Sequence, residues 1–425
     1  MSLWIVMGAQ WGDEGKGRIV DMLAEDADMV ARFSGGDNAG HTIRLGETVY
    51  KLHLVPSGII YPQTTCVMGN GMVINPAVLK EEIESLQKAG VTVNTQRLKI
   101  SQAAHIITPA HRALDGASEK KLGDRKIGTT GRGISPAYYE KVKRVGLRFV
   151  DMLNRDGFKA NLTHNLENTN RELTLLYGAE PLDVKSIVAD YLGYAEMFTP
   201  YIADVSGLVV DALATGKKVI AEGAQGALLD IDLGSYPYVT SSSCQAANAL
   251  LGLGIGIPKD VTTIGLVKAF QTRVGEGAFP TELFDETADF LRGDGTKQWD
   301  EYGTTTGRAR RIGWLDGVQL RRVVITNSIN ALALTKLDVL SGLKEIKVCT
   351  GYAALADERF AWISAEPARL VYESLPGWQE DLMGVRTWKD LPGQAQEYVH
   401  FIEKISGVPV RYISVGPERS QVIIR

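Results

Sequence analysis

The sequence is poor in cysteine, and its few cysteines are not arranged as a site. Cys66, Cys244 and Cys349 are odd in number and far apart, and the chain contains no CxxC motif or Cys/His ligand spacing. The spacing therefore supports neither a disulfide framework nor a zinc site. We expect buried or incidental thiols in a reducing compartment.

The sequence also lacks a dominant charge, a leader and a membrane-length apolar run. Its 46 Lys and Arg residues against 50 Asp and Glu residues give a net charge of −4, so no basic field would recruit nucleic acid or an anionic membrane. Residues 1–7 lack the basic start and cleavage site of a signal peptide, and no apolar run reaches the roughly 20 residues of a membrane span. These absences predict a cytoplasmic protein without nucleic-acid or membrane partners.

Short apolar runs alternate with amphipathic stretches along the chain. Runs such as LWIVM, KKVIAEG, TTIGLVKAF and ALALTKLDV are typical of buried strands, and helical patterns cover 77–89, 185–214, 317–330 and 394–406. This alternation predicts an α/β fold, with a mostly parallel central sheet flanked by helices. No repeat or linker divides the chain, so we expect a single domain over 1–425 with a more helical insertion at about 100–200.

Polar, glycine-rich turns follow many of these apolar runs. They include GAQWGDEGKG, GAQGALLD, TRVGEG, TKLD and SVGPER. Because ligands of open α/β sheets bind at the carboxyl ends of strands, we expect these loops to converge on one crevice.

The stretch GAQWGDEGKGR, Gly8 to Arg18, has the composition of a phosphate-binding turn. Such turns bind anions because backbone N–H groups and a helix N-terminus point at the ligand. A standard P-loop would have glycine in place of Gln10 and serine or threonine in place of Gly17, so the fold is predicted to be only P-loop-NTPase-like. Asp13 is then the candidate oxygen ligand for magnesium. Asp13 and Glu14 could instead merely complement a helix dipole, but the neighbouring glycines and lysine favour an anion site.

A second glycine-rich loop, SGGDNAGHT, presents His41 beside exposed backbone groups. An imidazole in that position suits phosphate transfer, as an acid or a hydrogen-bond donor. A lone histidine is more often structural than catalytic, and the flanking glycines shift the balance for this one. We interpret His105, His111, His164 and His400 as structural.

Two further loops offer groups for base and anion recognition. TKLD, Thr335 to Asp338, follows the apolar run ALAL, and a strand-end aspartate can accept hydrogen bonds from the N1–H and the amino group of guanine. Four residues alone are a weak signal, and only the accompanying phosphate loop favours a guanine nucleotide. The stretch YGTTTGRARRIGW carries Arg308, Arg310 and Arg311, which could form bidentate contacts with carboxylates or phosphates.

Together these motifs resemble the adenylosuccinate synthetase family. The resemblance rests on QWGDEGKG, GGDNAGHT, IGTTGRGISPAY, EGAQGALLDID, YPYVTSS, TRVGEGAFPTEL, GTTTGRARRIGWLD, TKLDVL and the GP after ISV, in the family's order from about residue 3 to 424. The family joins L-aspartate to IMP with GTP and magnesium, giving adenylosuccinate, GDP and phosphate in AMP biosynthesis. The resemblance therefore implies a GTP-dependent C–N ligase that forms a homodimer.

The resemblance also implies a role for each catalytic residue. Asp13 would take the N1 proton of IMP and ligate magnesium, so that the 6-oxyanion attacks the γ-phosphoryl group of GTP. The aspartate amine would then displace phosphate from the resulting 6-phosphoryl-IMP. Lys16 would neutralise phosphate charge, the Gly40 carbonyl would ligate magnesium, and His41 would act at the transferring phosphate. Gln225 is the remaining member of the implied catalytic set.

The binding residues implied by the resemblance form three groups. The GTP site comprises Gly12, Gly15, Lys16, Gly17, Gly40, Thr42, Arg310, Lys336, Leu337, Asp338, Ser414, Gly416 and Pro417. The IMP site comprises Asp13, Asn38, Thr130, Gln225, Thr240, Arg308 and, from the neighbouring subunit, Arg144. The aspartate site comprises Thr304, Thr305, Thr306 and Arg308.

The sequence departs from the family pattern at two places. CQAANALLG follows VTSSS where family members generally have a Gly-Gly pair, and Ala278 replaces a usual proline. The change at 243–248 lies near Thr240 and leaves open a relative that aminates another purine monophosphate such as dGMP, although Asp13 argues against it. A guanine-nucleotide switch protein is the alternative from another class, but it would not explain Gln225 and the arginine loop as a second nucleotide site.

Overall fold

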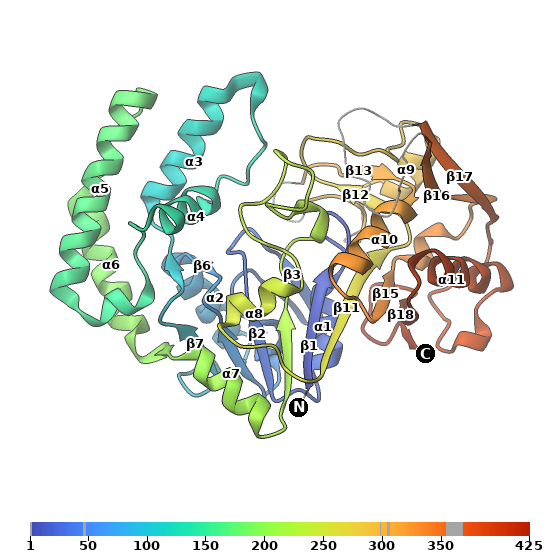
Figure 1. Ribbon diagram of the computed structural model, residues 1–425, viewed down its shortest axis with the longest axis horizontal. Coiled ribbons are helices and arrows are strands. Elements are labelled where there is room, and N and C mark those ends of the chain that lie inside the picture. Colours follow the sequence, from blue (N-terminus) through green and yellow to red (C-terminus); the bar gives the residue numbers. More distant parts are fainter. Residues whose placement is uncertain (1, 46–47, 298, 304–306, 354–368) are drawn as a thin grey trace.

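A ten-stranded sheet forms the centre of the computed structural model, which describes residues 2–45, 48–297, 299–303, 307–353 and 369–425 (Figure 1). In spatial order its strands are β19 (Val422–Ile424), β18 (Val410–Ser414), β15 (Ala331–Thr335), β11 (Val261–Lys268), β1 (Ser2–Gly8), β10 (Lys218–Glu222), β2 (Met29–Arg32), β5 (Thr65–Met68), β7 (Leu98–Ser101) and β9 (Ile202–Ala203). Within the described residues every neighbouring pair in this sheet is parallel except β18 and β19. The predicted mostly parallel sheet is therefore confirmed.

Each face of the sheet carries its own hydrophobic core, because successive side chains of a strand point to opposite faces. Leu3, Ile5 and Met7 of β1 enter one core, and Val6 enters the other. The first core is covered by α7 (Val205–Ala214), α8 (Ala247–Leu253), α10 (Gly317–Thr326) and α11 (Gly393–Ser406). The second is covered by α1 (Lys16–Ala24), α2 (Pro76–Lys88), α5 (Arg155–Tyr177) and α6 (Val184–Phe198). Burial on both faces explains why the strands read as nearly continuous apolar runs.

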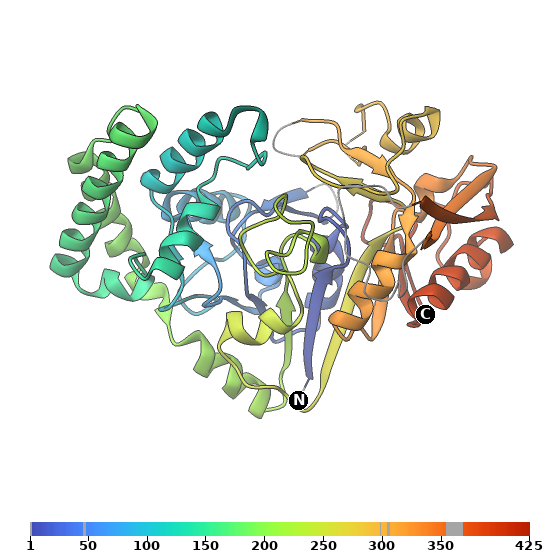
Figure 2. The same cartoon turned by 45° about the horizontal axis from the view of Figure 1, so that its top comes forward.

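The segment from about 100 to 200 is largely helical. It contains α3 (Pro109–Leu122), α4 (Ile134–Lys143), α5 and α6, which stand together at one end of the sheet (Figures 1 and 2). The pattern over 185–214 forms two helices rather than one. Helix α6 ends at Phe198, Pro200 lies in a 3-10 turn, and Asp204 caps α7 by accepting the N–H of Gly207 at 3.2 Å.

Smaller sheets complete the molecule. They comprise β12 (Gln271–Arg273) with β13 (Arg311–Gly313), β14 (Leu315–Asp316) with β16 (Glu345–Ala353) and β17 (Arg369–Pro376), β3 (His41–Leu45) with β4 (Thr48–Leu52), and β6 (Val73–Ile74) with β8 (His105–Ile106). The stretch TRVGEG begins within β12, so its turn lies beyond a strand of the two-stranded sheet and not beyond a central strand. Helix α9 (Glu286–Arg292) lies near β12 and β13 (Figure 1).

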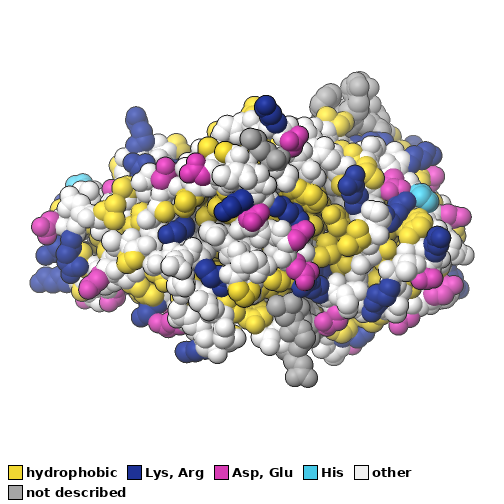
Figure 3. All heavy atoms as spheres, turned by 90° about the horizontal axis from the view of Figure 1, so that it is seen from below, with side chains coloured by type: hydrophobic (Ala, Val, Ile, Leu, Met, Phe, Trp, Pro, Cys, Tyr) yellow, Lys and Arg dark blue, Asp and Glu magenta, His cyan; other side chains and the backbone are white. Residues whose placement is uncertain are grey.

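The surface and the thiols agree with the composition. On the face seen in Figure 3, Lys and Arg side chains are intermingled with Asp and Glu side chains. All three cysteines are buried and free. None of the helices in the described part of the chain has the length and apolarity that a bilayer-spanning helix needs.

Candidate active site

Loops that follow the central strands meet at one edge of the sheet. At the end of β15 the Thr335 hydroxyl donates to the Glu14 carbonyl at 2.9 Å, and at the end of β11 the Lys268 N–H donates to Gln10 Oε1 at 2.9 Å. The Arg18 guanidinium contacts the hydroxyl of Ser414, the last residue of β18. The segment after β1 therefore contacts the carboxyl ends of β11, β15 and β18.

Glu14 organises the glycine-rich loop from inside. Its fully buried carboxylate accepts the N–H of Gln10 at 3.1 Å and that of Gly12 at 2.8 Å, and it pairs with Lys16 Nζ at 2.6 Å. The sequence interpretation considered Glu14 only as a dipole complement, whereas the structure makes it the internal anchor of the loop. Lys16 is thereby fixed at the start of α1.

Asp13 points away from this anchor. Its backbone lies in the left-handed region with φ 59°, which non-glycine residues adopt only when the surrounding structure holds them there. Its side chain is 43% exposed and lies 3.1 Å from Nε of Arg310. The Glu14 carboxylate is thus buried and holds the loop together, whereas the neighbouring Asp13 carboxylate is exposed beside Arg310.

His41, the first residue of β3, is held by a carboxylate that sequence analysis did not single out. Its Nδ1 bonds Glu222 at the end of β10, and Glu222 also accepts the hydroxyl and the N–H of Ser57 at 2.7 and 2.8 Å. Burial lowers the pKa of His41, against the opposing effect of Glu222. Burial alone would raise the pKa of Glu222, but His41 and Arg32 outweigh it and lower that pKa. A carboxylate only accepts, so Nδ1 carries the proton and the ring orientation is fixed.

Glu222 could have been found from one signal in the sequence. It is an acid at the end of the apolar run KKVIAE, immediately before the glycine turn GAQG. A buried acid costs free energy unless it is paired, so its place in a buried strand indicates a partner.

Gln225 carries buried polar atoms that have no partner in the described structure. Its backbone has φ 55°, and both its amide oxygen and its amide nitrogen are buried and unpaired. The amide lies against Gly35, where a Cβ would come within 3.1 Å of Oε1. On the same loop, Asn38 Oδ1 accepts the N–H of Gly36 at 3.2 Å. An unpaired buried amide beside a glycine-rich loop is typical of a ligand site.

Glu301 and Lys268, which sequence analysis missed, form a charge cluster with Arg310 and Lys336 behind Asp13. Glu301 is 1% exposed and contacts Lys268 Nζ at 2.8 Å, Lys336 Nζ at 3.2 Å and the guanidinium of Arg310. Burial alone would raise the pKa of Glu301, but Lys268, Lys336 and Arg310 outweigh it and lower that pKa. Lys268 closes the apolar run TTIGLVK, the same kind of signal as that of Glu222.

The predicted guanine-binding groups lie around the start of α1. Burial raises the pKa of Asp338, and Lys336 and Arg18 oppose this shift. Arg18 also contacts the carbonyl of Gly416. The side chain of Leu337 is fully buried in the core, so only its backbone is available to a ligand.

The remaining predicted site residues make fewer contacts with the residues described above. A Cβ on Gly17 would come within 3.0 Å of that of His41, so the first two loops touch there. Thr240 is fixed through its N–H to the Leu229 carbonyl at 2.8 Å. The remaining exposed candidates are Gly15, Gly40, Thr42, Thr130, Arg144 and Arg308. Thr304, Thr305 and Thr306 lie outside the described residues.

The atypical stretch at 243–248 is anchored by hydrogen bonds to buried side chains. Ser243 Oγ and the Cys244 N–H donate to Asp230 at 2.9 and 2.6 Å, and the Ala246 N–H donates to Asn327 at 2.7 Å. These bonds hold the stretch with buried partners of its own. Nearby, Ser241 Oγ lies 2.5 Å from Ser135 Oγ of α4, which connects this loop with the helical segment.

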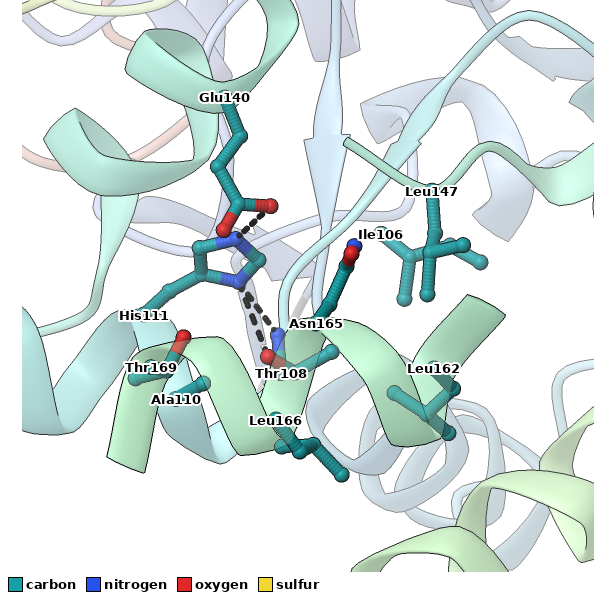
Figure 4. A pocket seen from close by; sticks show the side chains of 10 residues that line it. All are labelled: Ile106, Thr108, Ala110, His111, Glu140, Leu147, Leu162, Asn165, Leu166 and Thr169. Carbon is teal, nitrogen blue, oxygen red and sulfur yellow. Dashed lines mark hydrogen bonds and ion pairs between the residues drawn. The ribbon is translucent and has the colours of Figure 1, made fainter. Parts of the chain in front are cut away.

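His111, which the sequence analysis interprets as structural, contacts protein groups through both ring nitrogens. Figure 4 shows His111 between Thr108 and Glu140 in a small pocket lined by α3, α4 and α5. Its Nδ1 accepts the N–H of Thr108 at 2.8 Å, and its Nε2 lies 2.9 Å from Glu140. The Nε2 contact joins α3 to α4, whereas the Nδ1 contact caps the start of α3 itself.

Lys268 should give the protein a distinct stability dependence at alkaline pH. Burial lowers its pKa to about 8, which Glu301 only partly offsets, whereas an unfolded lysine has a pKa of about 10.4. Between about pH 8 and 10.4 the folded chain therefore binds fewer protons at this group than the unfolded chain, and its contribution to the free energy of unfolding rises with pH. Lys268→Met should remove that rise in denaturant titrations, whereas the exposed Lys347→Met should keep it. Equal pH slopes in the two variants would contradict this assignment.

Comparisons with known proteins cover the chain from end to end. The family model of adenylosuccinate synthetase matches residues 5–423. The adenylosuccinate synthetases of Carboxydothermus hydrogenoformans and Pelotomaculum thermopropionicum are 52% and 50% identical, each covering 100% of this chain and 99% of the relative. The fully ligated adenylosuccinate synthetase of Plasmodium falciparum aligns with a TM-score of 0.91 at 40% identity over 99% of both chains.

A more distant structure shares the fold alone. The cyanophage S-2L succinoaminodeoxyadenylate synthetase, bound to dGMP and dATP, aligns with a TM-score of 0.63 at 20% identity, covering 100% of this chain and 95% of that one. The family model matches nearly the whole chain, and the adenylosuccinate synthetases are about 50% identical to it, whereas the phage enzyme is 20% identical. The chain belongs to the adenylosuccinate synthetase family.

Proposed function

We propose that the loops at the carboxyl edge of the sheet join L-aspartate to IMP at the expense of GTP, through 6-phosphoryl-IMP. GTP-dependent ligation of aspartate to IMP, in AMP biosynthesis, is the activity of the family to which the chain belongs. The observation that carries the residue assignment is the outward carboxylate of Asp13, which lies on a phosphate-type loop and is 3.1 Å from Arg310. A nucleotide switch needs no such base.

Asp13 would act as the general base on IMP. Its carboxylate is exposed and positioned by a loop that Glu14 holds rigid, so it can reach a proton on a bound base edge. Gly12 brings the loop against the Gln225 backbone, where a Cβ would lie 3.7 Å away. The unpaired amide of Gln225 would then bond the same nucleotide, with Asn38, Thr240 and Arg308 as further IMP contacts.

Lys16 and His41 would act on the phosphates. Lys16 is buried and forms an ion pair with Glu14 in this structure. A bound phosphate would therefore be a second anionic partner for its ammonium group. Glu222 would support the imidazolium form of His41 when a phosphoryl oxygen approaches, because it can stabilise charge on the ring. Arg310, between Asp13 and Glu301, adds a further cation at the same place.

Magnesium fits the groups available. The exposed carboxylate of Asp13 and the exposed backbone of Gly40 offer the hard oxygen donors that this ion prefers. When bound, the ion would offset charge developing on the phosphoryl oxygens. We therefore propose these two residues as its protein ligands.

Guanine would be read by Asp338. Asp338→Asn should lower kcat/KM for GTP about tenfold, because the amide keeps one acceptor oxygen, turns a donor toward the other guanine N–H, and removes a charged hydrogen bond that contributes roughly 1.5–3 kcal/mol. The same variant should improve the relative use of XTP, whose base presents an acceptor. Steady-state kinetics with both nucleotides checks this, and an unchanged GTP preference would place guanine recognition elsewhere.

A homodimer is proposed around Arg144. This residue caps the C-terminus of α4 in the left-handed region, with φ 66°, and it is exposed. Exposed apolar side chains surround it, with Tyr139 64%, Val142 79% and Val145 45% accessible. An apolar surface of this kind around one cation favours a protein interface over a solvated helix face. We further propose a single domain over 1–425 and a cytoplasmic location.

Phosphate release tests the function. With purified protein and magnesium, release should require GTP, IMP and L-aspartate together. GTP hydrolysis independent of IMP and aspartate would favour a switch protein. Turnover with dGMP in place of IMP would favour the other purine monophosphate.

A further inference from the structure

Glu301 joins segments that are distant in the sequence. Its N–H donates to the Arg292 carbonyl at 2.8 Å, and its carbonyl accepts the N–H of Arg310 at 2.9 Å. Its backbone is therefore held on both sides, and its side chain is 1% exposed. The backbone of Glu301 is therefore fixed in position, and its buried side chain has little conformational freedom.

The two carboxylate oxygens of Glu301 face different parts of the site. Oε1 lies 3.2 Å from Lys336 Nζ, at the end of β15. Oε2 lies 2.8 Å from Lys268 Nζ and also bonds Arg310, whose Nε lies 3.1 Å from Asp13. One rigid group thus connects the guanine-side lysine with the arginine that contacts the proposed base.

Three cations of this cluster share one buried anion. Lys268, Arg310 and Lys336 all contact Glu301, while Asp13 lies beside Arg310 and Asp338 interacts electrostatically with Lys336. Removing a shared buried anion leaves the cations to repel one another. A change in the position of one cation should therefore alter the electrostatic interactions of the other two with Glu301.

We propose that Glu301 is a positioning residue that couples guanine recognition at Lys336 to the phosphate-site cation Arg310. This inference rests on the proposed function, which assigns GTP to these loops. When the guanine contact fixes Lys336, Glu301 keeps Arg310 in register with Asp13 and the phosphates. A nucleotide that fails to engage Lys336 then also loses part of its phosphate interaction.

A mutant cycle tests this coupling. Kd values for GTP are measured by calorimetry for Lys336→Met, Arg310→Met and the double variant, first with Glu301 intact and then in Glu301→Gln. With Glu301 intact, the two losses should be non-additive by about threefold or more, as is typical of residues in one charge network. In Glu301→Gln the losses should multiply. Additive losses with Glu301 intact, or equal coupling in both backgrounds, would overturn the proposal.

Two controls keep the test interpretable. Glu345→Gln removes an exposed carboxylate that lies 3.5 Å from Lys347, and it should leave the coupling unchanged. If Glu301→Gln does not fold, Glu301→Asp replaces it, since the shorter side chain keeps the charge but should not reach Lys336 and Arg310 together. Full coupling in Glu301→Asp would overturn the proposal. A native chain that releases no IMP- and aspartate-dependent phosphate would instead overturn the proposed function.

Discussion

Asp13→Asn is expected to fold normally and to lose turnover by a factor of at least roughly 10²–10⁴. The amide cannot take the N1 proton of IMP, and it is a poorer magnesium ligand, so lost metal binding should add to the loss. Folding should survive because the side chain is 43% exposed and the loop is anchored by Glu14 instead. The variant therefore separates the chemistry of the loop from its structure.

The measurement combines phosphate release at saturating substrates with thermal unfolding of the same preparation. Asp26→Asn is a matched control, since that carboxylate is 74% exposed and pairs with Lys218. The control should retain activity and stability. Near-normal turnover in folded Asp13→Asn would remove Asp13 as the base.

Arg144→Ala should raise KM for IMP by roughly ten- to a hundredfold, because a charge-assisted hydrogen bond contributes about 1.5–3 kcal/mol. A solvated helix face, the other interpretation of this basic stretch, predicts almost no effect. The exposed Tyr139, Val142 and Val145 around Arg144 support the interface. Lys143→Ala is a control from the same helix.

Subunit mixing distinguishes an active site completed by the neighbouring subunit from one formed within a single subunit. After exchange, Arg144→Ala combined with inactive Asp13→Asn should regain part of the activity, since a heterodimer has one site with both an intact Asp13 and a partner's intact Arg144. Native mass spectrometry confirms that exchange has occurred. Absence of rescue after exchange would mean that Arg144 serves its own subunit.

The order of apolar runs made the parallel sheet predictable, because strands buried on both faces need continuous apolar residues. The glycine loops were also predictable, since their composition follows from close backbone approach to a ligand. Glu222, Glu301 and Lys268 were not identified, because Glu222 and Lys268 are single charges at the ends of apolar runs and Glu301 is one of two adjacent acids in a polar stretch. Their partners, His41, Arg310 and Lys336, come from distant segments, and only the fold brings them together.

The structural role of Glu14 is a second feature that the sequence alone could not predict. Adjacent acids in one loop look alike in sequence, yet one is fully buried and its neighbour is 43% exposed. The left-handed backbone at Asp13 decides which of them faces outward.

The central place of β1 also has a consequence for how the chain folds. Its two neighbours, β10 and β11, begin at Lys218 and Val261, so the first strand has neither pairing partner until more than half of the chain is available. Closing such long loops costs entropy before any pairing is gained, and topologies rich in distant contacts fold slowly. During synthesis, the apolar run LWIVM would stay exposed while α1 and β2 emerge from the ribosome. The nascent chain therefore depends on its second half, or on a chaperone, to shield the strand that carries its phosphate loop.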